Sequence, residues 1–308
     1  MSSIRPTPIS QKQVAAFLKP RPRDSHKGMF GTVTVIGGGN GMIGAALLAG
    51  RAALKMGAGC VHVGLLSDDA PAVDLNVPEL MLHSAGDALK SFPHPNPPPK
   101  GEGVLLPSPT GRGIEGEGNV LVIGCGLGQG LAAQKLLYDA LLLDVPLVLD
   151  ADALNLIALR PDLRAMLHTR KTPAVFTPHP GEAARLLGCS TEAIQHDRAR
   201  SALSLVQKLG GSVLLKGAGS LCATRDGKLY LNQSGNPGMS AAGMGDVLAG
   251  MIGAFIAQGI APDNALLLAV HLHGAAGDEL AKQQATLGMS ATEVTEWARW
   301  LLNRIAPR

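Results

Sequence analysis

The apolar segments of this chain are short, continuous and regularly ended by glycine or aspartate. Runs such as Thr32–Gly38 (TVTVIGG) and the one that begins at Asn119 (NVLVIGCGLG) lack the polar alternation of a strand with one wet face. Ala- and Leu-rich helical stretches such as Gly44–Gly59 separate them. Strands that are apolar on both sides need a layer of helices over each face. The pattern predicts an α/β fold, with a mostly parallel sheet inside an α/β/α sandwich.

The rest of the chain continues this order. Further strands are expected in Cys60–Leu66, Pro146–Asn155, Pro173–Glu182 and Ser212–Gln233, the last with a hairpin turn at Arg225-Asp226-Gly227. From Asp246 to about Leu302 the sequence is expected to be mostly helical. The length of 308 residues permits two domains of about 150 residues or one large α/β domain. We expect a single domain over residues 1–308.

Residues 91–118 (SFPHPNPPPKGEGVLLPSPTGRGIEGEG) break the pattern. They are rich in proline and glycine and have no periodicity, so they offer little apolar surface to a core. We expect a flexible surface insertion in the domain. A lid over the active site is the alternative reading, although no residue in the segment matches a catalytic motif.

Charge and aromatic content exclude several classes of binding protein. Lys plus Arg number 27 and Asp plus Glu 24, and the net charge of +3 is too balanced for a nucleic-acid or polybasic membrane binder. With 5 Phe, 2 Tyr and 2 Trp, the chain has few platforms for base stacking. No secretory signal is visible, and the longest strongly apolar run, Val247–Ala257, is too short to span a bilayer. We expect a cytoplasmic protein without nucleic-acid or membrane partners.

The cysteines do not form a recognisable framework. Cys60, Cys125, Cys189 and Cys222 lack CxxC spacing, and each lies in or beside an apolar run. We therefore expect reduced core residues rather than a zinc site or disulfides.

Ligands of an open α/β sheet bind at the carboxyl ends of its strands. The candidate segments are therefore residues 37–44, 124–130, 150–155, 177–182, 216–220 and 236–246. The first contains Gly39–Gly44 (GNGMIG), which matches the GxGxxG pattern of dinucleotide-binding folds. That pattern calls for an acidic residue after the next strand, and Val61–Leu66 is followed by none before Asp68. An NAD-dependent dehydrogenase site is therefore not favoured.

The strongest signal is Asn236–Gly250 (NPGMSAAGMGDVLAG), in which small residues lead directly into an apolar helix. Backbone N–H groups at such a helix entrance favour an anion. Asp246 supplies one carboxylate there, which suits a base that takes the proton of a hydroxyl attacking a phosphoryl group. The alternative is that Asp246 only complements the helix dipole.

The arrangement resembles the GxGD anion hole of the ribokinase-like superfamily. Within it, the chain resembles the ADP/ATP-dependent NAD(P)H-hydrate dehydratases from about Ile9 to Leu302, apart from residues 91–118. The resemblance rests on stretches in family order and spacing: His26–Gly31, Gly44–Ala49, Gly124–Gly128, Leu149–Asn155, Thr177–Glu182, Lys216–Gly219 and Asn236–Met239. It implies a ribokinase-like fold.

The resemblance also implies an activity. Members of the family repair NADH and NADPH that have been hydrated at the nicotinamide ring, the hydrate known as NAD(P)HX. ADP, or ATP, would phosphorylate the ring hydroxyl of the S-epimer, and phosphate would then leave, with NAD(P)H and AMP as products when ADP is the donor. Asp246 would be the base, and Gly243, Met244 and Gly245 would hold the nucleotide phosphate. Met244 stands where the family usually has threonine, a change that keeps the backbone donors.

Other site residues carry over from the same resemblance. Lys216, Gly217, Ala218, Gly219 and Ser220 resemble the loop that holds the AMP part of the nucleotide, although an ordinary turn would also explain the glycines. Further positions would contact the substrate: Ala45, Gly126, His179, Asp246, Lys27, Asp150 and Asn155. For Ala45 and Gly126, close helix–strand packing is the alternative, and for Lys27 a solvated side chain.

Glu182 has two readings. The resemblance gives it a place in holding Mg²⁺, through water, whereas its spacing from His179 is that of a capping box with proline at the first helical position. Asp150 and Asp152 also stay open: one would face substrate or metal, and the other would cap the following helix.

The competing functions are a vitamin-precursor kinase of the same superfamily and a non-catalytic nucleotide-binding regulator. Many relatives carry a fused epimerase domain, for which this sequence has no room before Ile9. We therefore expect a stand-alone dehydratase that is paired with a separate epimerase. Relatives also suggest a homotetramer. The preference for ADP or ATP, and for the hydrate of NADH or NADPH, stays open.

Overall fold

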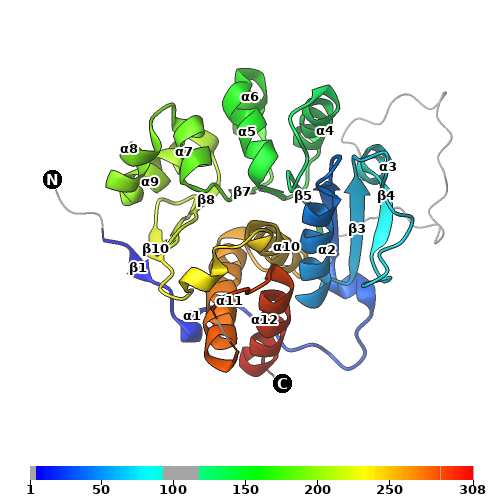
Figure 1. Cartoon of the computed structure of the whole chain (residues 1–308), viewed down its shortest axis with the longest axis vertical. Coiled ribbons are helices and arrows are strands. Elements are labelled where there is room, and N and C mark those ends of the chain that lie inside the picture. The colour runs from blue at the N-terminus through cyan, green and yellow to red at the C-terminus, as the bar shows by residue number, and fades with distance from the viewer. Residues whose placement is uncertain (1–4, 93–117, 285, 308) are drawn as a thin grey trace.

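The computed structural model describes residues 5–92, 118–284 and 286–307. These residues contain one sheet of ten strands, in the order β1-β10-β9-β8-β7-β6-β5-β2-β3-β4 (Figure 1). The strands are β1 (Thr7–Pro8), β2 (Thr32–Gly37), β3 (Cys60–Leu65), β4 (Met81–Ser84), β5 (Asn119–Ile123), β6 (Leu147–Leu149), β7 (Ala174–Phe176), β8 (Ser212–Leu215), β9 (Leu221–Ala223) and β10 (Leu229–Leu231).

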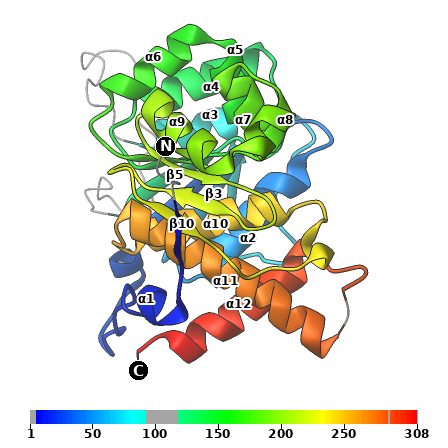
Figure 2. The same ribbon diagram turned by 90° about the vertical axis from the view of Figure 1, so that its left-hand side faces the viewer.

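Helices cover the sheet on both sides (Figures 1 and 2). They are α1 (Gln11–Ala15), α2 (Ile43–Lys55), α3 (Ala85–Lys90), α4 (Leu131–Leu142), α5 (Ala151–Leu159), α6 (Pro161–Thr169), α7 (Pro180–Leu187), α8 (Thr191–His196), α9 (Arg198–Leu209), α10 (Met244–Ala257), α11 (Pro262–Gln283) and α12 (Ala291–Ile305), with 3₁₀ turns η1 (Lys27–Phe30) and η2 (Pro237–Met239). The long helices of the last third were expected from the sequence.

Strand direction confirms the expected architecture. Neighbouring strands are parallel except at β9, which is antiparallel to both β8 and β10. The expected turn at residues 225–227 joins β9 to β10. The short edge strands β1 and β4 were not predicted, because two to four mostly exposed residues carry no apolar run.

The strands divide their side chains between two cores. Val33 and Val35 of β2 belong to a core with α2, α10, α11 and α12, whereas Ile36 belongs to a second core with α3 to α9. Strand β5 repeats the division, with Val122 in the first core and Ile123 in the second. Because successive side chains of a strand point to opposite faces, an unbroken apolar run fills both cores at once.

Two expectations about individual residues need correction. Cys125 and Cys222 are buried as expected, but Cys189 is exposed and Cys60 only partly buried, so the four cysteines are free without all being core residues. The first residues of the expected insertion also differ, because Phe92 is 5% exposed and packs in the second core. The remainder of that insertion, residues 93–117, lies outside the described residues.

Helix α10 crosses the middle of the sheet in close contact with α2. A Cβ atom on Gly250 would lie 2.0 Å from the carbonyl oxygen of Ala49, so only glycine allows the two backbones to approach this far. This contact fixes where the first turn of α10 lies relative to the carboxyl ends of the strands. No helix in the described ranges is both long and apolar enough to cross a membrane.

The α2–α10 contact predicts a stability change. We expect Gly250→Ala to lower the free energy of unfolding by about 1–3 kcal/mol, because the added methyl group forces apart two buried backbones. The control is Gly86→Ala in α3, where an added Cβ meets nothing within 4 Å. That substitution should leave stability unchanged or slightly higher. Urea denaturation measures both, and equal effects would mean that the helix contact is not tight.

Candidate active site

Three neighbouring strands meet at one carboxylate. Asp150 follows β6 and is 1% exposed, and its Oδ1 accepts hydrogen bonds from Thr177 Oγ1 at the end of β7 and from Lys216 Nζ after β8, both at 2.7 Å. Burial acts to lower the pKa of Lys216, but the carboxylates of Asp150 and Glu182 outweigh it, so the pKa is raised. Lys216 is therefore charged and anchored at the sheet edge.

The backbone holds Asp150 in this position. Ala151 has φ +48°, and it is the one non-glycine residue with positive φ in the described part of the chain. Such strain tends to occur where surrounding contacts impose a functional geometry. Asp150 occupies the N-cap of α5 but makes no capping bond, whereas Asp152 accepts a 2.8 Å bond from the Gly128 amide. Neither carboxylate therefore caps α5, contrary to expectation: Asp150 faces the cluster, and Asp152 binds the neighbouring loop.

Asp246 lies in the first turn of α10, which begins after Gly243 (φ +86°). Burial, and then the charge of Asp150, raise the pKa of Asp246 to about 6, although a hydrogen bond with Cys125 and the charge of Lys216 oppose the shift. The Cys125 thiol is fully buried, and its own pKa is raised by burial and by both carboxylates. Asp246 is therefore a partly buried carboxylate with a raised proton affinity, as a general base requires.

Asp150, Asp246 and Cys125 also form the candidate cation cluster. One potential ligand atom from each lies within 4.8 Å of the others. Mg²⁺ prefers oxygen ligands, so the two carboxylates fit it and the thiol does not. The second oxygen of Asp150, Oδ2, lies on the side of Gly245, 3.5 Å from where a Cβ would be. This oxygen faces the entrance of α10.

Glu182 and His179 form the capping box that their spacing suggested. The His179 amide donates to Glu182 Oε2 at 2.8 Å, and His179 Nδ1 accepts from the Gly181 amide at 3.0 Å. Because Nδ1 accepts, Nε2 carries the ring proton, and it lies 3.3 Å from Glu182 Oε1. Burial raises the pKa of Glu182 to about 7. One carboxylate oxygen of Glu182 is thus hydrogen-bonded by the His179 amide, and the other lies near the ring of His179, whose side chain is itself half exposed.

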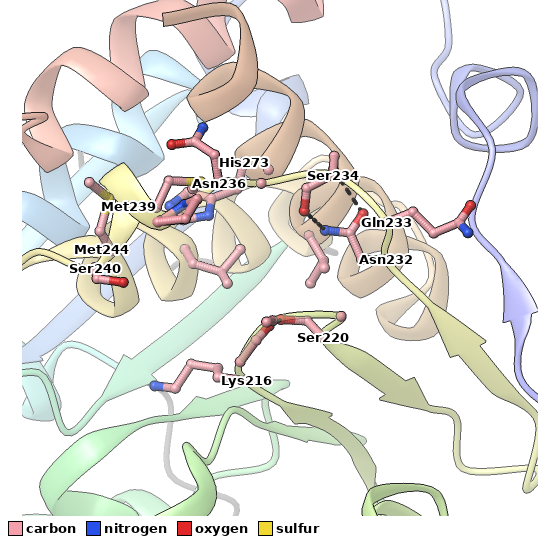
Figure 3. A pocket seen from close by; sticks show the side chains of 18 of the residues that line it. Lys216, Ser220, Asn232, Gln233, Ser234, Asn236, Met239, Ser240, Met244 and His273 are labelled. Carbon is pink, nitrogen blue, oxygen red and sulfur yellow. Dashed lines mark hydrogen bonds between the residues drawn. The ribbon is translucent and has the colours of Figure 1, made fainter. Parts of the chain in front are cut away.

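A cavity of about 500 Å³ opens beside Lys216 and the start of α10 (Figure 3). Its lining includes five of the expected nucleotide residues in sequence, Lys216 to Ser220, together with Met244 and Gly245, but not Gly243. The opposite wall consists of residues 232–237 and part of α11. Arg198 of α9 fixes the loop, because its guanidinium donates to the carbonyls of Leu215, Lys216 and Gly219 at 3.2–3.4 Å.

The first glycine-rich loop and the loop after β5 are joined to each other. The Gly38 and Gly39 amides donate to the carbonyls of Cys125 and Gly126 at 3.0 and 2.6 Å. Gly126 has φ +60°, and a Cβ there would lie 3.1 Å from that of Ala45. Ala45 and Gly126 therefore pack closely at the edge that carries Asp246. The packing reading is present in the structure, and a substrate contact stays a prediction.

One expected substrate residue lies elsewhere. Lys27 is in η1. Its carbonyl oxygen lies against Gly59, the residue just before β3, where an added Cβ would be only 1.8 Å away. Gly31, which follows η1, lies against the Ala257 carbonyl at the carboxyl end of α10. Along the helix axis, Ala257 is about 17 Å from Asp246, at a rise of 1.5 Å per residue. The expected contact of Lys27 with the site is therefore not supported, because η1 lies at the amino ends of the strands. Asn155 accepts a 2.9 Å bond from Arg185, at the border between α5 and α7.

Several helices start at this edge without a capping side chain. The N-caps of α2, α4, α5 and α10 make no side-chain hydrogen bond to their first turns. Their dipoles and first-turn amides favour negatively charged groups, although in α5 the Asp152 amide already donates to the Gly124 carbonyl. This edge of the sheet is therefore suited to bind anions.

Sequence reasoning missed other members of the site. Thr177 was quoted only as part of a motif, and the place of Cys125 beside Asp246 had no signal except its position between two glycines. The cavity wall formed by Asn232, Ser234 and His273 had none, because an isolated polar residue in an apolar helix or strand has no distinctive pattern.

Comparisons with known proteins agree with this geometry. A family model described as NAD(P)H-hydrate dehydratase matches residues 33–299. The ADP-dependent (S)-NAD(P)H-hydrate dehydratase of Neisseria meningitidis is 40% identical over 93% of this chain and 90% of its own length. The bifunctional NAD(P)H-hydrate repair enzyme Nnr of Escherichia coli is 41% identical over 96% of this chain, which spans 52% of that relative.

Solved structures give the same result. An ADP/ATP-dependent NAD(P)H-hydrate dehydratase from Bacillus subtilis, co-crystallised with ATP and Mg²⁺, superposes with a TM-score of 0.82 at 29% identity, covering 98% of this chain and 100% of that one. A ribokinase-like superfamily protein from Enterococcus faecalis gives 0.76 at 26% identity, over 97% and 96% of the two chains. The expected ribokinase-like fold is thereby confirmed, and the chain belongs to the NAD(P)H-hydrate dehydratase family.

Proposed function

We propose that this chain dehydrates the S-epimer of hydrated NADH or NADPH back to NAD(P)H, with ADP as phosphoryl donor. The observation that carries the proposal is the position of Asp246, a carboxylate with raised pKa at the entrance of α10 beside a cavity of about 500 Å³. Relatives named for this reaction support it, with the Neisseria meningitidis protein matched over most of both chains.

The nucleotide would occupy that cavity. We place its AMP part along Lys216–Ser220 and its terminal phosphate at the amides of Gly243, Met244 and Gly245, where the dipole of α10 and the charge of Lys216 stabilise it. The substitution of methionine for threonine at residue 244 does not alter backbone donors. The exposed Gly217 and Gly219 leave the loop backbone open to the ligand.

The chemistry is a phosphoryl transfer followed by an elimination. Asp246 takes the proton of the ring hydroxyl, and the hydroxyl oxygen bonds to the β-phosphorus of ADP as the bond to AMP breaks. The phosphorylated ring then loses a proton from the adjacent carbon, and the carbon–oxygen bond breaks. Inorganic phosphate departs with the former hydroxyl oxygen, and the ring double bond is restored.

Mg²⁺ fits the site, and we propose that Asp150, through Oδ2, holds it together with the nucleotide phosphates. When bound, the ion supplies positive charge that neutralises the phosphates. For Glu182 we propose at most a contact through water, since the His179 amide already binds one of its oxygens and the imidazole lies 3.3 Å from the other. Lys216 keeps Oδ1 of Asp150 engaged, which leaves Oδ2 for the ion.

The hydrated nicotinamide would lie on the other side of Asp246. We propose contacts with Ala45 and Gly126, whose lack of bulk leaves the backbone accessible, and with the half-exposed side chain of His179. Asn155 would act from farther away, through Arg185. The uncapped starts of α2 and α4 favour the phosphates of the dinucleotide.

We also propose that the chain folds as a single domain and that four copies form a homotetramer in the cytoplasm. A separate epimerase would interconvert the two epimers of the hydrate. The two competing functions differ from the main proposal in their products. A kinase would stop at a phosphorylated product, and a regulator would bind the nucleotide without turnover.

The first prediction is nucleotide-dependent repair. Enzymatically hydrated NADH, incubated with the protein, Mg²⁺ and ADP or ATP, should regain the absorbance of the reduced nicotinamide, and should not do so without nucleotide. Recovery without any nucleotide would contradict the phosphorylation mechanism. A phosphorylated hydrate that accumulates would favour the kinase, and nucleotide binding without any reaction would favour the regulator.

The second prediction concerns the base. Asp246→Asn keeps the size of the side chain but cannot take a proton, so we expect kcat for hydrate repair to fall at least ~10²-fold. The matched control is Asp87→Asn, an exposed side chain on α3, which should leave kcat unchanged. If Asp246→Asn retains near-normal turnover, the residue is only a helix-terminal charge.

The same substitution predicts a dependence of stability on pH. Burial raises the pKa of Asp246 to about 6 in the folded protein, so its contribution to stability is complete below its unfolded pKa and is lost as pH rises through about 6. Asp246→Asn should therefore gain stability relative to the wild type as pH rises from about 4 to about 6, with little further change above that. Denaturation in a chelator without nucleotide measures this difference, and a difference that is constant with pH would show that the carboxyl is not perturbed.

A further inference from the structure

Apart from the exposed Gln233 and Ser240, the polar side chains of the cavity lining are mostly engaged with the protein itself. Asn232 and Ser234 bond to each other, with Ser234 Oγ donating to Asn232 Oδ1 at 2.9 Å. Asn236 donates to Asp278 at 3.1 Å and accepts from the Gly238 amide at 3.0 Å. Ser220 Oγ donates to the Gly217 carbonyl. These side chains shape the cavity and have little hydrogen-bonding capacity left for a ligand.

His273 of α11 differs from them. Its side chain lines the same cavity and is 8% exposed, yet Nε2 has no hydrogen-bond partner among the described residues (Figure 3). In the described ranges, one other buried side-chain atom lacks a hydrogen-bond partner, Nε of Arg170. The terminal nitrogens of that guanidinium donate to backbone carbonyls at residues 141–145. A buried polar atom without a partner costs about 1–3 kcal/mol, so its retention needs a reason.

The face of α11 around His273 contains two glycines that allow the opposite wall of the cavity to approach closely. Val270, His273, Gly274 and Gly277 share this face, at helical spacing. A Cβ on Gly274 would lie 2.4 Å from Ser234 Oγ, and one on Gly277 would lie 2.3 Å from the sulfur of Met239. Among these four residues, only His273 presents a polar side chain.

The imidazole is neutral in this position. Burial, with a smaller effect from the charge of Lys216, lowers the pKa of His273 to about 4. A neutral imidazole has one N–H donor and one lone pair, which suit the uncharged polar groups of a base or sugar. In the proposed function the phosphates have Lys216 and the amides at the start of α10, so His273 on the opposite wall is left for the nucleoside.

We propose that His273 is a specificity-determining residue that hydrogen-bonds the nucleoside part of the nucleotide. This inference rests on the proposed function, since it assumes that the cavity takes ADP. In the free protein Nε2 of His273 is unpaired and sealed from solvent, so in this account the imidazole turns toward the nucleoside when the nucleotide binds, and its nitrogen then gains a partner. The unpaired nitrogen thus lowers the stability of the free protein, and its hydrogen bond to the nucleoside raises the affinity for the nucleotide.

The test separates a ligand contact from a structural role. His273→Leu should leave the melting temperature of the free protein unchanged or higher, because the orphaned nitrogen is removed and an apolar side chain of similar size replaces it. The same variant should bind ADP about 5- to 30-fold more weakly by titration calorimetry, as expected for one lost buried hydrogen bond. Binding of inorganic diphosphate, which lacks the nucleoside, should not change.

The matched control is His271→Leu, on the same helix but outside the cavity lining, which should alter neither affinity. The inference is overturned if His273→Leu binds ADP as the wild type does, if ADP and diphosphate weaken together, or if the melting temperature of the free variant falls by several degrees. The proposed function fails separately: a wild-type protein that binds no ADP refutes both, whereas normal repair by His273→Leu at unchanged ADP affinity refutes only this inference.

Discussion

One oxygen atom, Oδ1 of Asp150, holds the ends of three neighbouring strands together. Thr177 and Lys216 both donate to it at 2.7 Å, from the ends of β7 and β8, while Asp150 itself follows β6. A buried ion pair of this kind is stable only when both partners and the surrounding hydrogen bonds are present. The pair fixes Lys216 beside the entrance of α10, and the close packing of α10 on α2 brings Asp246 to the same place. The geometry of the proposed reaction depends on this junction.

The electrostatics of the junction are unbalanced. One cation, Lys216, lies among three carboxyl groups, those of Asp150, Asp246 and Glu182. Burial raises the pKa of Asp246 to about 6 and that of Glu182 to about 7. The ionised form of Asp246 is therefore disfavoured. The carboxyl group is stabilised when it takes up a proton or when a cation lies beside it. The uncapped helix starts around it favour anions. A site with both properties suits a nucleotide that brings its own cation, and a hydroxyl that supplies its proton to the base.

The sequence predicted the sheet well because each inner strand must fill two cores, and this requirement leaves a continuous apolar run. It also predicted which loops gather around Asp150 and Asp246, since those loops follow carboxyl ends of strands. It could not separate Asp150 from Asp152, whose roles depend on the backbone strain at Ala151. Lys27 was misplaced, because a motif in the right order does not say at which edge of the sheet its loop lies. His273 was missed because one histidine in an apolar helix resembles any core residue.

The most direct test of this account follows the hydroxyl oxygen of the hydrate. NADH hydrated in ¹⁸O-water carries the label on the ring hydroxyl, and its repair with ADP can be followed by mass spectrometry of the inorganic phosphate released. If Asp246 activates that hydroxyl for phosphorylation, each phosphate will carry one labelled oxygen, in equal amounts with AMP and NADH. Unlabelled phosphate, with the label in water, would contradict the account, because ADP hydrolysis and dehydration would then be separate events.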